Sequence, residues 1–214
     1  MKKIFFVAMA LLPVLYFSAG CKKNNEIDTT SSFKNMVWTG TFHYTGDVDE
    51  PYSLKFREDS SFLWFEYNGL NFGTWKLDEK KLTLTFSAGK PITAAVSDGK
   101  TLANIQNDHA NARFVNSGEL NTTVDQKLEG TTWKEKNNLG TLTFNAFKNV
   151  TTTGIFAIIP QNSSYVGDPG AIYCTSPLSP GNSFFAVVMS DGKTMRFVNK
   201  YITTPYHPYV MIKQ

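Results

Sequence analysis

The chain has 214 residues and a mass of 24.0 kDa, enough for one medium-sized domain or two small ones. Aromatic residues make up 14% of it, which excludes disorder over most of the length, and a net charge of only +3 argues against binding to nucleic acid. The 15 glycines and 9 prolines favour a turn-rich β protein.

The N-terminus has the pattern of a secretory signal peptide. Two lysines are followed by an apolar run over residues 4–17, which is interrupted by Pro13. This run is shorter than the ~20 residues that a membrane-spanning helix needs. Residues 1–20 are therefore expected to be removed on export.

The end of this segment, Ser18-Ala19-Gly20-Cys21, resembles the lipobox of bacterial lipoproteins, with Ser18 where leucine is more usual. The resemblance implies cleavage before Cys21 and attachment of several acyl chains, palmitate-like, to that residue. Several chains anchor a soluble domain stably where one would not. The lipid bilayer of the outer membrane is thus an expected partner through Cys21, and residues 21–33 are expected to form a lipidated cysteine and polar tether.

Beyond the tether the dominant period is two, as in half-buried antiparallel strands. The mature chain is therefore predicted to be all-β. Because a lipidated Cys21 cannot pair, no disulfide is expected in the mature chain. Cys174 is expected to be a small buried apolar residue rather than a nucleophile. Alternating strands are predicted at residues 54–57, 82–86 and 142–144, and type I′ hairpin turns at Asn68-Gly69, Asp98-Gly99 and Asp191-Gly192.

Two features indicate an internal repeat. The string Ser-Asp-Gly-Lys-Thr occurs at 97–101 and 190–194, and Trp38 has a counterpart in Trp133 at a similar offset. A second string, Arg-Phe-Val-Asn at 113–116 and 196–199, requires a different alignment of the halves. The polar stretch 117–130 is expected to be a linker. We predict two tandem small antiparallel β-barrel or sandwich domains, at 34–118 and 128–214; the alternative is one larger barrel built by both halves.

The first half resembles the small lipocalin-like domains of Bacteroides-group lipoproteins. The resemblance rests on a Trp-x-Gly opening, a Gly-x-Trp strand and a Leu-x-Leu strand, and it covers roughly residues 36–103. The second half keeps Trp133 but lacks the Gly-x-Trp. The resemblance implies small antiparallel barrels that bind a ligand or partner. The matching strings are Trp38-Thr39-Gly40, Phe62-Leu63-Trp64, Gly73-Thr74-Trp75-Lys76-Leu77 and Leu82-Thr83-Leu84.

Motifs for catalysis or metal binding are absent from the sequence. His43, His109 and His207 are too far apart for a zinc motif, and the acidic stretch 46–50 lacks the later ligands of a calcium loop. The two Gly-Lys-Thr strings lack the earlier glycine of a phosphate loop. We therefore expect no cofactor, no metal and no enzymatic activity. A hydrolase with an unrecognised pair of carboxylates is the remaining alternative.

Three segments are apolar on both faces: 62–67, 155–159 and 184–189. Because a barrel strand buries one face, something should cover the other, either the second half of the protein or a ligand or partner. A turn-rich insertion is expected at 160–181. A separate aromatic run precedes the C-terminus, and a binding site is expected where these two segments meet. The candidate binding residues are Trp64, Phe65, Tyr67, Tyr165, Tyr173, Tyr206 and Tyr209.

The function expected from these features is that of a membrane-anchored, non-catalytic lipoprotein that binds a small apolar or sugar ligand or an envelope protein. The alternative is a structural or inhibitory module that docks on another protein. These two functions predict different barrel interiors. A ligand carrier should enclose an apolar cavity, whereas a docking module should have barrels filled by side chains and an exposed flat patch.

Overall fold

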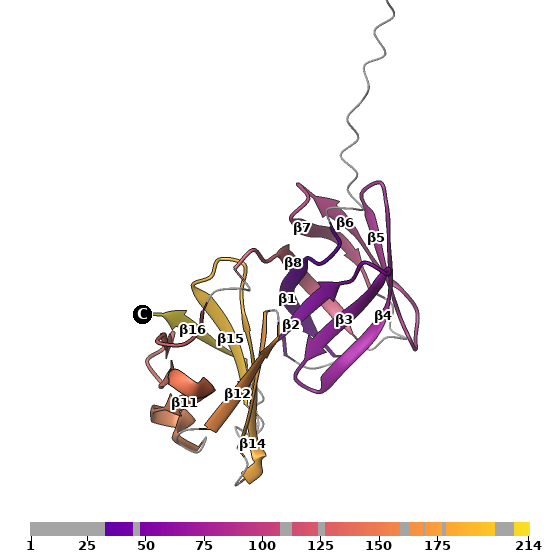
Figure 1. Ribbon diagram of the computed structural model, residues 1–214. Helices are drawn as coiled ribbons and strands as arrows, with labels where there is room; N and C mark the ends of the chain where they lie inside the picture. Colours follow the sequence, from indigo (N-terminus) through magenta and orange to yellow (C-terminus); the bar gives the residue numbers. More distant parts are fainter. Residues whose placement is uncertain are drawn as a thin grey trace, which may run out of the picture.

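The structure of the protein is a computed structural model, which describes residues 33–44, 48–107, 113–123, 127–158, 163–168, 170–176, 179–199 and 208–214. Within them the chain is all-β, as expected, and forms two antiparallel barrels that lie side by side (Figure 1). No helix in the described residues is long and apolar enough to cross a membrane. The signal peptide, Cys21 and the tether lie outside the described residues.

Each barrel is built by strands from one half of the chain, and all pairings between the described strands are within one barrel. The first barrel contains β1 (Val37–His43), β2 (Glu50–Phe56), β3 (Ser61–Glu66), β4 (Gly69–Asp78), β5 (Lys81–Phe86), β6 (Ile92–Ser97), β7 (Thr101–Gln106) and β8 (Phe114–Leu120). The second contains β9 (Thr132–Glu135), β10 (Thr141–Phe144), β11 (Asn149–Thr152), β12 (Ser163–Asp168), β13 (Ala171–Ser176), β14 (Ser179–Val188), β15 (Thr194–Asn199) and β16 (Tyr209–Lys213). This arrangement differs from the alternative of one larger barrel.

Aromatic side chains fill the first barrel. Trp38, Tyr52 and Trp64 point inward and are fully buried, and the rings of Tyr52 and Trp64 stack with centroids 3.9 Å apart. Phe33 lies at one end, where its ring stacks on Trp38 at 5.2 Å. Because Phe33 belongs to the core and β8 extends to Leu120, the barrel reaches beyond the range 34–118 at both ends.

The second barrel is closed by β9, which pairs with both β10 and β16. Its core contains Trp133, Phe144 and Phe197, all buried. Cys174 lies in this core as a fully buried thiol that belongs to no disulfide, which confirms its expected burial. Burial of a reduced cysteine among apolar side chains is a common structural role of this residue type.

The strand positions agree with one of the two repeat alignments. Trp38 lies in the first strand of its barrel and Trp133 in the first strand of the other. The two Ser-Asp-Gly-Lys-Thr strings both join the sixth strand to the seventh. In contrast, the Arg-Phe-Val-Asn strings lie in the eighth strand of one barrel and the seventh of the other, so they are not equivalent.

The hairpin turns have less uniform conformations than predicted. Both central residues have positive φ only at Asp98-Gly99, with φ 52° and 65°. At Asn68-Gly69 and Asp191-Gly192, only the glycine has positive φ. The Asp191 carboxylate instead accepts hydrogen bonds from the backbone N–H groups of Lys193 and Thr194, at 2.9 and 2.8 Å. This side chain therefore shapes its turn without a type I′ backbone.

Three sequence-based expectations about other segments were wrong. The apolar run after Gly154 forms a 3-10 helix, η3 (Gly154–Ile158), and not a two-faced strand. The segment 160–181 is not an insertion, because β12, β13 and the start of β14 occupy its described part. The predicted linker 117–130 starts too early, since β8 continues to Leu120.

The other two apolar segments, β3 and β14, do bury both faces. Trp64 and Phe184 point into their own barrels, whereas Phe65 and Phe185 point outward and meet between the barrels. The second face of Phe62–Tyr67 is therefore packed against protein, as predicted. We call this contact the inter-barrel cluster; it consists of Phe65, Ala171, Phe185 and Val187, with Leu63, Tyr67, Tyr173 and Met189 packed around them.

A second contact joins the barrels at the turn between β12 and β13. Gly170, with φ 74°, lies so close to the outer face of β1 and β2 that an added Cβ would be 2.8 Å from the Ser53 hydroxyl. The outward side chains of Thr39 and Ser53 are fully buried here. Nearby, the Asn121 amide donates a hydrogen bond to the carbonyl of Val188 at 2.7 Å. Apolar and polar contacts thus hold the barrels together.

The inter-barrel cluster predicts energetic coupling between the halves. Phe65→Ala and Phe185→Ala should each lower the free energy of unfolding by about 3–5 kcal/mol, because each leaves a cavity. The double variant should lose less than the sum by about 0.5–3 kcal/mol, since Tyr173 contacts both rings. Denaturant unfolding measures these values. The control is Trp64→Ala, which should be additive with Phe185→Ala because Trp64 lies inside the first barrel. An unchanged stability of Phe65→Ala would contradict this contact.

Candidate functional site

The predicted binding residues do not form one site. Trp64 is in the interior of the first barrel, and Tyr165 and Tyr209 pack in or against the core of the second. The structure brings together Phe65, Tyr67 and Tyr173, which belong to the inter-barrel cluster. Tyr206 lies outside the described residues. Most of these aromatic side chains therefore have structural neighbours that account for their burial.

The interior of the first barrel offers little space for a ligand. The cavity between β2, β5, β6, β7 and β8 has a volume of about 10 Å³, which is about enough for one water molecule. It is lined by Tyr52, Leu82, Leu84, Ile92, Ala94, Leu102, Ile105 and Val115. The stacked rings of Tyr52 and Trp64 occupy the neighbouring volume.

Exposed apolar side chains lie instead on the outer face of the first barrel. Leu70 and Phe72 on β4 are 53% and 60% exposed. Across the sheet, Leu70 is opposite Phe65 and Phe72 is opposite Leu63. The apolar surface that begins in the inter-barrel cluster therefore continues onto β4, beyond the part that the second barrel covers. We call the exposed pair Leu70 and Phe72 the β4 face.

The sequence contained a signal for this face that pattern analysis missed. In β4 the apolar residues change phase, since Leu70 and Phe72 occupy even positions whereas Trp75 and Leu77 occupy odd ones. The pairing of β4 with β3 and β5 is regular, so no bulge accounts for the change. Such a phase change in a regular strand predicts that one apolar pair faces outward.

The end of the first barrel opposite Phe33 is closed by polar groups around Glu66, which is 1% exposed. Its carboxylate accepts hydrogen bonds from the Tyr44 hydroxyl at 2.6 Å and the Trp64 indole at 2.7 Å. The Asn71 amide donates at 3.1 Å. Arg113 donates two more, from Nε and Nη2, each at 3.1 Å. Five donors thus satisfy this buried carboxylate.

Arg113 completes this closure. Its guanidinium lies over the rings of Phe86 and Tyr44, 5.0 and 5.9 Å from their centroids. Burial works to lower the pKa of Arg113, but the hydrogen bonds and charge of Glu66 outweigh it, so this pKa is raised. Burial and the hydrogen bond to Glu66 raise the pKa of Tyr44 to about 12. Tyr44 is therefore neutral at neutral pH, beside the contact between Arg113 and Glu66.

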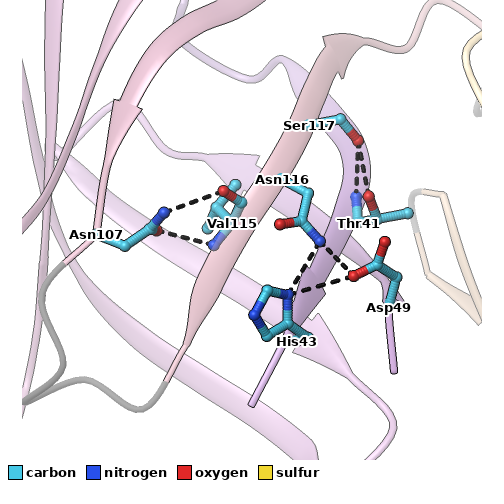
Figure 2. A network of polar contacts seen from close by, with 7 residues as sticks. All are labelled: Thr41, His43, Asp49, Asn107, Val115, Asn116 and Ser117. Carbon is cyan, nitrogen blue, oxygen red and sulfur yellow. Dashed lines mark hydrogen bonds and ion pairs between the residues drawn. The ribbon is translucent and has the colours of Figure 1, made fainter. Parts of the chain in front are cut away.

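A network of side-chain hydrogen bonds holds β8 where its pairing is irregular (Figure 2). The Asn107 amide donates to the carbonyl of Val115 and accepts from its N–H, at 3.1 and 2.8 Å, in place of a strand neighbour. On the other side, a register shift between Thr41 and Phe42 is bridged by Ser117, whose hydroxyl accepts from the Thr41 N–H at 3.1 Å. Side-chain hydrogen bonds thus replace backbone ladder bonds at the irregular edges of β8.

The same network contains the one described histidine. The Nδ1 atom of His43 lies 3.3 Å from the Asp49 carboxylate and 3.2 Å from the Asn116 amide, and the ring stacks on Phe114. These contacts of the described residues include no hydroxyl or thiol nucleophile. The other two histidines of the sequence, His109 and His207, lie outside the described residues.

An open groove of about 360 Å³ runs along β6 and β7 beside the turn between β4 and β5. Charges of both signs and small side chains line it, without an aromatic ring, so it indicates no one class of ligand. Its lining residues are Asp78, Glu79, Lys80, Lys81, Thr93, Ala94, Ala95, Asn104 and Gln106. Among the described residues, no group of three His, Cys, Asp or Glu side chains is placed to hold a metal ion.

No protein-family model matches the chain, and no curated protein sequence matches it significantly.

The ion pair at the barrel end predicts a large difference between two charge deletions. Arg113→Ala should lower the free energy of unfolding by about 3–5 kcal/mol, because it leaves the buried Glu66 carboxylate without its cation. The matched control is Lys76→Ala, which breaks an exposed pair with Asp78 and should cost about 0–1 kcal/mol. Denaturant unfolding at neutral pH measures both. Equal losses would show that the Arg113 pair does not stabilise the barrel.

Proposed function

We propose that the protein is a lipid-anchored, non-catalytic binding protein of the bacterial cell envelope, attached to the outer membrane. Its two barrels act as lipocalin-like domains, and it binds another macromolecule through the β4 face. The single observation that carries the binding surface is the exposure of Leu70 and Phe72 next to a buried apolar contact. Contiguous exposed apolar side chains commonly mark interaction sites in soluble proteins.

The small cavity inside the first barrel supports a docking role over carriage of a ligand enclosed in that barrel. A site for a drug-sized molecule usually needs a pocket of ~300–1,000 Å³. The cavity of about 10 Å³ in the first barrel is far below this range. Binding at the outer face requires no rearrangement of the core, in which Trp38, Tyr52 and Trp64 are fully buried.

The lipid anchor is supported by the sequence at Cys21. The described chain starts at Phe33, so residues 22–32 separate the anchor from the first barrel. A chain of this length spans at most ~40 Å. The β-barrels would therefore stay close to the membrane surface, with enough tether to reorient.

The anchor predicts the outcome of one substitution. Cys21→Ser removes the thiol that would carry the acyl chains, so the variant should lose labelling by a radioactive fatty acid and move from the membrane pellet to the soluble fraction. The control is Cys174→Ser, which removes the other thiol, buried in the second barrel, and should leave labelling intact. Persistent labelling of Cys21→Ser would contradict the proposed attachment.

The β4 face predicts where a partner is captured. A photo-crosslinking amino acid at Leu70, in the full-length protein in its native membrane, should give a discrete adduct. The same group at Lys136, an exposed residue of the second barrel, is the control and should give none. Adduct formation is read from the shift in electrophoretic mass. Equal patterns at the two positions would contradict a docking role for this face.

A further inference from the structure

We infer that the second barrel carries a separate binding site for a small organic cation, that is, an alkylammonium or alkylguanidinium compound. The site is an open groove of about 280 Å³ beside the turn that joins β9 to β10. It belongs to other strands than the β4 face and does not depend on the function proposed above. The chemistry of the groove follows from its buried carboxylate, its apolar wall and its size.

The carboxylate is that of Glu135, the last residue of β9 and the buried residue among those that line the groove. Its Oε2 atom accepts hydrogen bonds from the N–H groups of Asn137 and Leu139, at 2.5 and 3.2 Å. Its Oε1 atom accepts one from the Asn137 amide at 3.2 Å and keeps capacity for another donor. All three donors are neutral, and among the described residues no ion pair includes Glu135. Because a buried charge is costly without a counter-charge, this carboxylate favours a positive ligand.

The first barrel shows how the chain itself satisfies such a carboxylate. Glu66 is 1% exposed, and Arg113 supplies both a positive charge and two hydrogen bonds to it. Glu135 is 4% exposed, and beside it is a groove in place of an arginine. A cation from solution can therefore supply to Glu135 what Arg113 supplies to Glu66.

One positive side chain, Lys136, also lines the groove. Its side chain is exposed, and its backbone N–H extends the strand by donating to the carbonyl of Val210 at 2.9 Å. Water and salt screen an exposed charge, whereas the buried charge of Glu135 is screened much less. Lys136 therefore opposes a bound cation only weakly.

The wall of the groove is formed by Tyr209, Val210 and Leu139. The ring of Tyr209 packs edge-on against Phe156, with centroids 5.1 Å apart, which holds it in place. Burial and the negative charge of Glu135 raise the pKa of Tyr209, so its hydroxyl is neutral at neutral pH. A cation is attracted to the face of such a ring, and an alkyl stem gains from contact with the apolar wall.

The size of the groove favours a small ligand over a larger one. Sites for drug-sized molecules usually have volumes of ~300–1,000 Å³, and about 280 Å³ is at the lower end of this range. A short alkyl chain with one cationic group matches this volume and can place its charge at Glu135 and its stem against Leu139 and Tyr209.

Titration of the purified full-length protein with butylguanidinium, followed by NMR, tests the inference. The backbone N–H resonances of Asn137 and Leu139 report on the site, because both groups donate to Glu135. They should shift with a dissociation constant of about 1 mM, as expected of so few contacts. Butylurea, which has a similar shape without the charge, should bind about tenfold more weakly. Equal shifts from both compounds, or no shift, would overturn the inference.

Two variants test the role of the carboxylate. Glu135→Gln keeps the size of the side chain but removes its charge, and should weaken binding of butylguanidinium about tenfold. Leu139→Lys, at a position 42% exposed, leaves the core intact and should weaken binding by placing a fixed cation in the groove. Its matched control is Phe147→Lys, which is 90% exposed at the other end of the barrel and should leave binding unchanged. Equal affinities of Leu139→Lys and Phe147→Lys would overturn the site.

Two further measurements test the sign of the charge effect and the kind of ligand. Lys136→Gln removes the like charge from the groove and should tighten binding by about twofold to threefold. A weaker binding of this variant would contradict recognition of a cation. The peptide acetyl-Gly-Arg-Gly-amide presents the same guanidinium on a polypeptide, and it should bind no more tightly than butylguanidinium. If it binds tenfold more tightly, the groove takes a side chain of another protein, and the small-molecule site is wrong.

Discussion

Two strands that are apolar on both faces determine how this protein is assembled. A closed barrel removes only one face of each strand from water, so β3 and β14 would each leave an apolar face in solvent if the barrels were separate. Fully burying one large apolar side chain stabilises a protein by roughly 1.5–3 kcal/mol. Phe65 and Phe185 obtain this burial from each other's barrel, with Tyr173 between them. The side-by-side arrangement of the barrels follows from this contact (Figure 1).

The same strand also closes one end of the first barrel. On the inward face of β3, Phe62 and Trp64 belong to the apolar core, and Glu66 follows at the next inward position. A carboxylate there must be paired and hydrogen-bonded, because the surrounding rings cannot solvate it. Arg113, just before β8, supplies the ion pair, and Tyr44, just after β1, donates a hydrogen bond. Core, interface and polar closure thus depend on six consecutive residues.

Much of this architecture could be predicted from period-two alternation. The strands β2, β5 and β10 and the buried thiol of Cys174 follow from local pattern and composition. The 3-10 helix η3 could not, because a short apolar run has the same composition in a buried strand and in a helical turn. In this helix Gly154 lies against the backbone of Leu139, and the N–H of Ile155 donates to the Leu139 carbonyl. Leu139 is too distant in the sequence for a local pattern to reveal this contact.

The strands β12 and β13 were hidden for a related reason. Turn-forming residues lie in and between them, with Pro160 before β12, Pro169-Gly170 between the strands and Pro177 after β13, yet β13 pairs along its whole length with the apolar strand β14. Long-range pairing with a strongly apolar neighbour overrode the local preference. The expected insertion is therefore part of the wall of the second barrel, and Tyr173 on it contacts Phe65 of the first.

The candidate site shows where sequence reasoning stops. Alternation revealed that Phe65 and Tyr67 lie on a second apolar face, but it could not say which part of that face the other barrel covers. That depends on how far the second barrel reaches across the sheet, and it reaches β3 but leaves Leu70 and Phe72 on β4 exposed. Leu70 and Phe72 therefore form an apolar pair outside the contact between the barrels, which depends on the docking of two domains and not on the local pattern of one strand.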